Sequence, residues 1–128
     1  MALTHSTAAK NAATDAVVDL IDAGSGDANG DLVFMTAGSA EVATLAFSAT
    51  AFGNASSGVA TANAITSDIN ATGGTVALFK IQNKSNTEVL RGTVTASGGG
   101  GDIEMSSTGV GAGDTVAVSS LTYEALTQ

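Results

Sequence analysis

The sequence predicts a mainly β protein: an antiparallel β-sandwich or jelly-roll-like domain of about seven strands with one N-terminal helix. After Gly24, short runs rich in Val, Thr, Ile and Phe alternate with clusters of Gly, Asn, Asp and Ser at strand-like spacing. Proline is absent, so no residue is barred from donating its N–H to a sheet ladder. Only one segment has helical periodicity, which excludes repeated βαβ units.

A chain of 128 residues fits one domain, because this length lies near the common domain size. No internal repeat or long linker divides the sequence, so we expect residues 1–128 to form a single β domain. Within it, we expect residues 1–6 to form an extended arm, residues 7–23 a helix and residues 31–126 the β-sandwich.

The predicted helix begins at a capping residue, Ser6 or Thr7, and ends at Gly24, which suits the left-handed position after a helix. Its apolar residues recur at the spacing of one helical face. We expect this face to pack against the sheet or against a sister subunit, and the polar residues to lie mainly elsewhere around the helix. The stripe consists of Ala9, Ala13, Ala16, Val17 and Leu20, of which Ala13, Ala16, Val17 and Leu20 are the candidate interface residues.

Seven segments are predicted to be strands, and turn residues separate them. Asn83–Asn86 is predicted to be a hairpin turn, and the four glycines at 98–101 a flexible hairpin tip. A bulge near Ser119 would bring Val116, Val118 and Tyr123 to a common inward face. The predicted strands are residues 31–36, 42–48, 58–65, 75–82, 88–96, 102–106 and 115–126.

Composition limits the partners of this chain. Its formal net charge is −8, and it has only 4 basic residues. A chain this acidic is repelled by nucleic acid and by anionic membranes, so we expect neither as a partner. Many of its apolar residues are alanines, which bury little area each, so we expect neighbouring subunits to add to its stability.

The residue inventory argues against an enzyme and offers no cofactor site. Cysteine is absent, and His5 is the only histidine. A nucleophile activated by His5 would depend on a terminal residue, and the usual zinc sites lack their ligands. Acidic residues on or beside predicted strands are interpreted as solvated rather than as a paired catalytic acid and base. These acidic residues are Glu41, Glu88, Glu104 and Glu124.

One loop has partial calcium-loop spacing. Asp27, Asn29 and Asp31 stand at the first, third and fifth positions of such a loop, where oxygen ligands hold the cation. The pattern then fails, because Leu32 replaces the required glycine and Gly38 replaces the final glutamate. We therefore prefer an Asn–Gly turn that introduces the first strand, and keep the three residues as weak metal candidates.

Five segments of the chain carry a family resemblance: residues 6–16 (STAAKNAATDA), 20–26 (LIDAGSG), 58–68 (GVATANAITSD), 103–107 (IEMSS) and 112–122 (AGDTVAVSSLT). Together they resemble small structural proteins of tailed bacteriophage particles. The resemblance covers nearly the whole chain but contains no catalytic motif.

The resemblance implies a virion component, with head decoration as the preferred role. Such a protein binds the major capsid protein on the outside of the capsid, commonly as a homotrimer. The first residues lack the pattern of a secretory signal, so we expect synthesis in the host cytoplasm. The alternatives are a phage tail or fibre component, and a calcium-dependent surface-binding β module.

Overall fold

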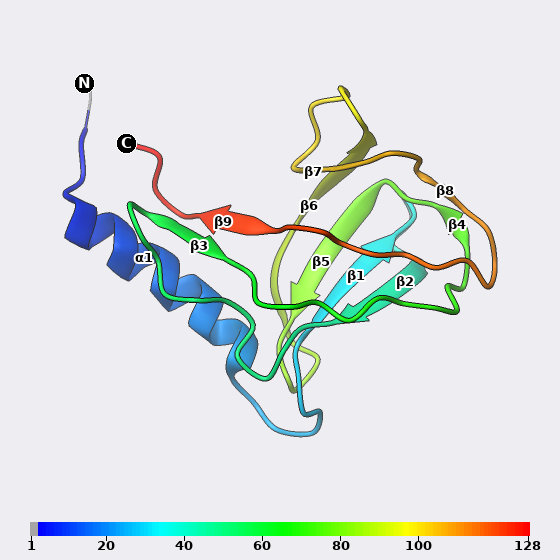
Figure 1. Ribbon diagram of the computed structural model, residues 1–128, viewed down its shortest axis with the longest axis horizontal. Coiled ribbons are helices and arrows are strands. Elements are labelled where there is room, and N and C mark those ends of the chain that lie inside the picture. Colours follow the sequence, from blue (N-terminus) through cyan, green and yellow to red (C-terminus); the bar gives the residue numbers. More distant parts are fainter. Residues whose placement is uncertain (1–2) are drawn as a thin grey trace.

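The computed structural model describes residues 3–128, and it is mainly β with one N-terminal helix, as the sequence predicts (Figure 1). Helix α1 spans Thr7–Asp19 and continues into a 3-10 turn, η1, at Leu20–Asp22. The strands are β1 (Asp31–Met35), β2 (Glu41–Ala46), β3 (Val59–Thr61), β4 (Gly74–Thr75), β5 (Leu78–Gln82), β6 (Glu88–Ala96), β7 (Ile103–Met105), β8 (Gly109–Val110) and β9 (Thr122–Glu124).

A five-stranded sheet in the order β2-β1-β5-β6-β7 is the main layer of the fold. Its first four strands are antiparallel, and Phe34 on β1 lies opposite Phe79 on β5. The turn at residues 83–86 joins β5 to β6, which confirms the predicted hairpin. Asn83 closes this turn with its side chain, which accepts hydrogen bonds from the N–H groups of Ser85 and Thr87.

Two short ribbons, β3–β9 and β4–β8, complete a curled, sandwich-like arrangement. The predicted strands 58–65 and 115–126 shrink here to three residues each, and β8 was not predicted. The reason is that these segments pair with several neighbours in turn. Within 58–65, Ala62 bridges to Phe52 after β3 has paired with β9, and within 115–126, Val116 bridges to Asp68, so neither segment stays beside one partner long enough to form a long ladder.

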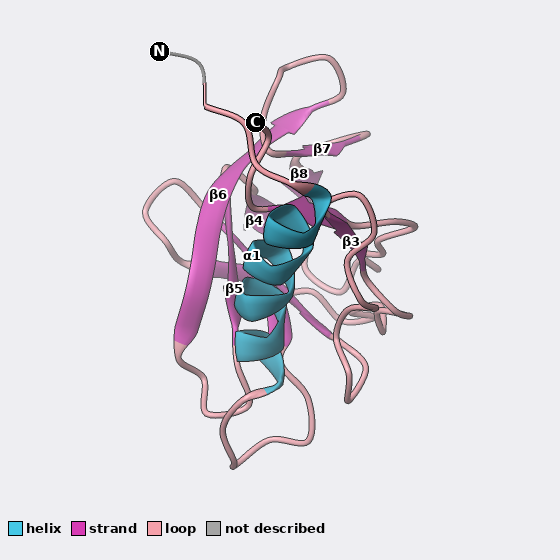
Figure 2. Cartoon of the chain, turned by 90° about the vertical axis from the view of Figure 1, so that its left-hand side faces the viewer, coloured by secondary structure: helices cyan, strands magenta, loops and turns pink. Residues whose placement is uncertain are grey.

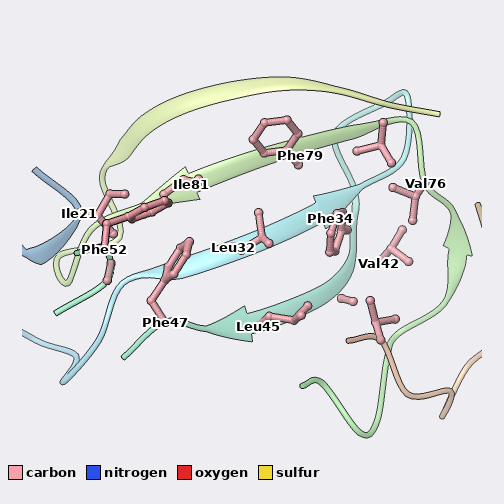
Figure 3. Packing of buried hydrophobic residues seen from close by; sticks show 14 of the residues in the cluster. Ile21, Leu32, Phe34, Val42, Leu45, Phe47, Phe52, Val76, Phe79 and Ile81 are labelled. Carbon is pink, nitrogen blue, oxygen red and sulfur yellow. The ribbon is translucent and has the colours of Figure 1, made fainter. Parts of the chain in front are cut away.

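Large side chains from both layers fill the core (Figure 3). Leu32 and Phe34 of β1 project from the sheet beside Phe79 and Ile81 of β5. All four phenylalanines of the chain are buried, and the rings of Phe47 and Phe52 lie 5.7 Å apart. The few large residues are therefore concentrated in the interior, and alanines fill the gaps between them.

Helix α1 packs along β3 and β9, but not through the apolar stripe that the sequence indicated (Figure 2). Its buried residues are Thr14 and Val18, followed by Ile21 in η1. Ser6 caps the helix, accepting a 3.1 Å hydrogen bond from Ala9 N–H, and Gly24 has a positive φ, as predicted. Packing against the sheet was one of the two expected roles of this stripe, and Ala16 and Leu20 do not fill it, because both are exposed. Packing against a sister subunit, the other expected role, stays a prediction.

Polar side chains explain this orientation of the helix. Asn11, Asp15 and Asp22 each accept one backbone N–H of the irregular segment 51–58, at 2.7, 2.7 and 2.8 Å. Thr14 is fully buried, donates to the carbonyl of Gly58 at 2.7 Å and accepts from the N–H of Ala125 at 3.1 Å. The segment has no complete ladder of its own, so the helix supplies the acceptors that its buried N–H groups require.

The glycine run 98–101 is not a hairpin tip, because β6 and β7 are parallel, with Val94 opposite Ile103. The chain must therefore turn back on itself within a few residues. Gly98 and Gly100 have positive φ, and a Cβ atom on Gly99 would lie 2.7 Å from the Cβ of Thr95. Four glycines in a row therefore permit one tight return of the chain.

Candidate functional site

The three weak metal candidates lie at the start of β1. Asp31 is half-buried and receives a long 3.4 Å hydrogen bond from the amide of Gln82 on β5, while Asp27 is exposed. The loop is held by the 83–86 turn instead of by an Asn–Gly turn of its own: Asp27 N–H donates to the carbonyl of Lys84 at 2.9 Å. Asn29 and Gly30 have no positive φ, so the positive-φ geometry typical of the predicted Asn–Gly turn is absent.

Burial raises the pKa of the Asp31 carboxyl, and the nearby negative charge of Asp27 raises it further, while the hydrogen bond from Gln82 opposes both. A bound cation would lower that pKa. Within residues 3–128, no group of three or more His, Cys, Asp or Glu side chains is arranged to hold a metal ion.

The strand carboxylates have structural partners. Glu41 accepts the hydroxyl hydrogens of Thr44 and Thr72, at 3.2 and 2.6 Å. Glu104 accepts the N–H groups of Gly98 and Gly100 at 3.0 and 3.3 Å, and so fixes the glycine return. Glu41 therefore links β2 to the segment at Thr72, and Glu104 holds the glycine run next to its own strand.

His5 lies beside the other end of the chain. Its backbone N–H and its Nδ1 atom both contact the carbonyl of Gln128, at 3.0 and 2.7 Å. Residues 1 and 2 of the predicted arm lie outside the described residues. His5 therefore joins the two chain ends, and it has no contact with a serine or an aspartate among the hydrogen bonds of residues 3–128.

The candidate interface residues, three on α1 and Leu20 at the start of η1, form an outward stripe. Leu20 is 53 % exposed and Ala16 is exposed, whereas Ala13 and Val17 are half-buried at the margins. Ala9 and Ala12, both exposed, extend the same side of the helix toward its N-terminus. We call the six residues the helix stripe: Ala9, Ala12, Ala13, Ala16, Val17 and Leu20.

A groove opens between the β6–β7 end of the sheet and the segment that carries β9. Its volume is about 440 Å³, and its floor is formed by Phe52, Phe79 and Ile81. Leu90 on one wall and Tyr123 on the other are only partly buried. A second hollow, of about 630 Å³, continues from it between β7 and residues 114–122. We call the first of these the β6–β9 groove.

Charged side chains surround the β6–β9 groove. Arg91 forms a 2.7 Å ion pair with Glu88, and this contact lowers the pKa of Glu88. Asp102 accepts both the N–H and the hydroxyl of Thr93, at 2.9 and 3.1 Å, and these hydrogen bonds lower its pKa. Asp102 and Glu124 have no basic partner among the ion pairs of the described chain, so the rim of the groove is acidic.

The sequence did not indicate this groove. Its residues come from β5, β6, β9 and the segments beside them, which are up to about 70 positions apart in the chain. A weak signal was present: Leu121 and Tyr123 were out of phase with Val116 and Val118, as expected for a chain that leaves one pairing and enters another.

Comparisons with known proteins give no relative: no protein-family model, curated protein or solved structure matches the chain. Among residues 3–128, no helix has the length and apolar character needed to cross a bilayer.

Proposed function

We propose that this protein is a non-enzymatic structural component of a bacteriophage particle, which binds the outside of the capsid lattice as a head decoration protein. In this proposal its partners are the major capsid protein and two further copies of itself in a homotrimer. It is made in the host cytoplasm and works on the capsid surface. The resemblance of its helix and closing segments to tailed-phage structural proteins supports this role.

The outward helix stripe is the structural observation that carries the proposal. A polar face docks α1 on its own domain, through Asn11, Asp15 and Asp22, and leaves alanines and Leu20 facing outward. Small side chains allow close approach of another backbone, and an apolar stripe on a chain of net charge −8 gains from being covered. Intersubunit contact is the role we give to this stripe.

Capsid binding tests the proposal directly. Purified protein is titrated onto phage capsids that lack it, and bound protein is counted after sedimentation and located by electron microscopy. We expect saturation at a fixed number of copies per lattice position. Absence of binding, or absence of the protein from purified virions, would contradict the proposal. If the protein is located on the tail or its fibres, it is a tail or fibre component and not a head decoration protein.

A matched pair of variants tests the helix stripe. Leu20→Lys places a charge on the stripe, whereas Ile69→Lys places the same charge at a 77 % exposed isoleucine elsewhere on the surface. We expect Leu20→Lys to reduce trimer formation, measured by sedimentation equilibrium, and Ile69→Lys to leave it unchanged. If the two variants form trimers to the same extent, the helix stripe is not part of the subunit interface.

A further inference from the structure

The hydrogen-bonded strands of this fold run almost around the whole molecule. β9 pairs with β3, and the chain that continues from β3 bridges at Thr66 to β2. From β2 the pairing proceeds through β1 and β5 to β6. Within the described chain no pairing joins β6 to β9, so the circuit is interrupted at the position of the β6–β9 groove.

The two edges of the five-stranded sheet differ in how far their backbone groups are hydrogen-bonded. At the β2 edge, the carbonyls of Val42 and Ala46 accept hydrogen bonds from Gly73 and Thr66, and the N–H of Thr44 donates to Asp68 at 2.9 Å. The β2 edge is therefore capped by the molecule's own chain.

The β6 edge is open over most of its length. β7 pairs with β6 only at Val94, Thr95 and Ala96, and the N–H of Thr93 donates to Asp102 at 2.9 Å, so among the described residues the open part of this edge is 88–92. Figure 2 shows β6 as a long strand at the margin of the sheet. An unpaired strand edge next to an apolar groove is the geometry that accepts an added strand.

We propose that the β6–β9 groove binds an extended segment of a partner protein, which adds as a strand along β6, and which alternates apolar residues with lysine or arginine. The apolar residues of such a segment would cover Leu90 and Tyr123 above the floor of the groove. Its basic residues would face Asp102 and Glu124 at the rim. This surface is separate from the helix stripe, and the inference does not depend on the capsid proposal.

Charge selects this occupant over a second copy of the chain. Within residues 3–128 the rim presents Asp102 and Glu124 without ion-pair partners, and a second copy has only 4 basic residues against 12 acidic ones to place beside them. Arg91, the basic residue of the groove, is already paired with Glu88. A strand with basic side chains would therefore pair with the open backbone groups of β6 and also place positive charges beside the carboxylates of the rim.

A titration with synthetic peptides, followed by NMR of the full chain, tests the inference. The probe alternates valine and lysine over nine residues, which covers the open part of β6, residues 88–92, and extends past its Glu88 end. One control replaces its lysines with glutamates, and a second carries N-methyl groups that block strand pairing. We expect saturable shifts at the amides of Leu90, Arg91 and Tyr123 with the probe, and none of comparable size with either control.

Two charge-reversal variants sharpen the test. Glu124→Lys alters an exposed residue of the rim, and Asp19→Lys makes the same change on the exposed side of α1. We expect Glu124→Lys to raise the Kd of the probe about threefold to tenfold, and Asp19→Lys to raise it less, because Glu124 lines the groove and Asp19 does not.

The remaining outcomes overturn the inference. No saturable shift, or shifts outside the groove, would show that it does not accept a strand. Equal binding of the glutamate peptide would contradict the acidic rim, and equal binding of the N-methylated peptide would contradict strand addition. Concentration-dependent shifts at the same amides without any peptide would identify a second copy as the occupant. None of these results bears on capsid binding, which is measured separately.

Discussion

The carboxylate of Asp15 on α1 accepts a 2.7 Å hydrogen bond from the N–H of Ala55, which lies 40 positions further along the chain. Together with Asn11 and Asp22, it anchors the irregular segment 51–58 to the helix. A helix face that looks solvated in the sequence is thus the face that docks, because these side chains satisfy backbone groups that no strand pairs.

Replacing Asp15 by Ala is expected to lower the free energy of unfolding by about 1–2 kcal/mol, because the partly buried N–H of Ala55 loses its acceptor. Asp15→Asn keeps an oxygen acceptor and should cost less. Urea denaturation followed by circular dichroism measures both. If the two variants are equally stable, the hydrogen bond does not hold the segment.

The hydroxyl of Thr14 is expected to contribute more to the free energy of unfolding than its methyl group does. Thr14→Val keeps the shape but leaves the carbonyl of Gly58 and the N–H of Ala125 without this partner, at a cost of about 2–4 kcal/mol. Thr14→Ser keeps the hydroxyl and loses about 1 kcal/mol of apolar burial. Denaturant midpoints give the order, and a Val variant as stable as the Ser variant would contradict the prediction.

Substitutions at neighbouring positions of the glycine run between β6 and β7 are expected to change the stability of the protein by different amounts. Gly98 has a positive φ but open space around it, and asparagine tolerates that conformation, so Gly98→Asn should cost under about 1 kcal/mol. A side chain at Gly99 meets Thr95, and Gly99→Asn should cost about 2–3 kcal/mol. Unfolding curves compare the two, and equal costs would indicate a flexible loop.

Asp31→Asn is expected to stabilise the protein at pH 7. The pKa of Asp31 is raised in the folded state, so the folded protein binds the proton more tightly than the unfolded chain does. Stability therefore falls as the pH rises from near 4 through the raised folded value, and the variant removes that fall. The half-exposed position limits the gain to under about 1 kcal/mol.

Thermal melts of Asp31→Asn between pH 3 and pH 7 test this prediction. Glu124→Gln makes the same change of net charge at an exposed residue and serves as the control. An Asp31→Asn variant whose melting temperature follows the wild type across this range would show that burial does not perturb the carboxyl. Addition of calcium to the wild type should leave its melting temperature unchanged, whereas a rise would support a cation at Asp27, Asn29 and Asp31.

Local patterns in the sequence predicted much of the fold. The helix start at Ser6, the positive φ of Gly24, strand β6 at Glu88–Ala96 and the hairpin turn at 83–86 all depend on contacts between near neighbours. The predicted first strand, 31–36, also agrees with β1 to within one residue. Propensity and turn chemistry act over short distances, so they are visible in one sequence.

The sequence did not show which distant segments of the chain would pack or pair with one another. Periodicity identified an apolar stripe on the helix, but the buried face was decided by three polar side chains that reach backbone groups up to 47 positions away. The glycine run was predicted to be a hairpin tip, yet the parallel pairing of Val94 with Ile103 depends on how the sheet curls. Neither arrangement has a local signature.

The sequence by itself determined a mainly β chain with one helix, an acidic surface and an inventory poor in reactive side chains. Only the tertiary structure decided which helix face is outward and where the circuit of strands stays open between β6 and β9. The physical reason is that composition and periodicity report single segments, whereas hydrogen-bond satisfaction and burial are properties of segments brought together from across the chain.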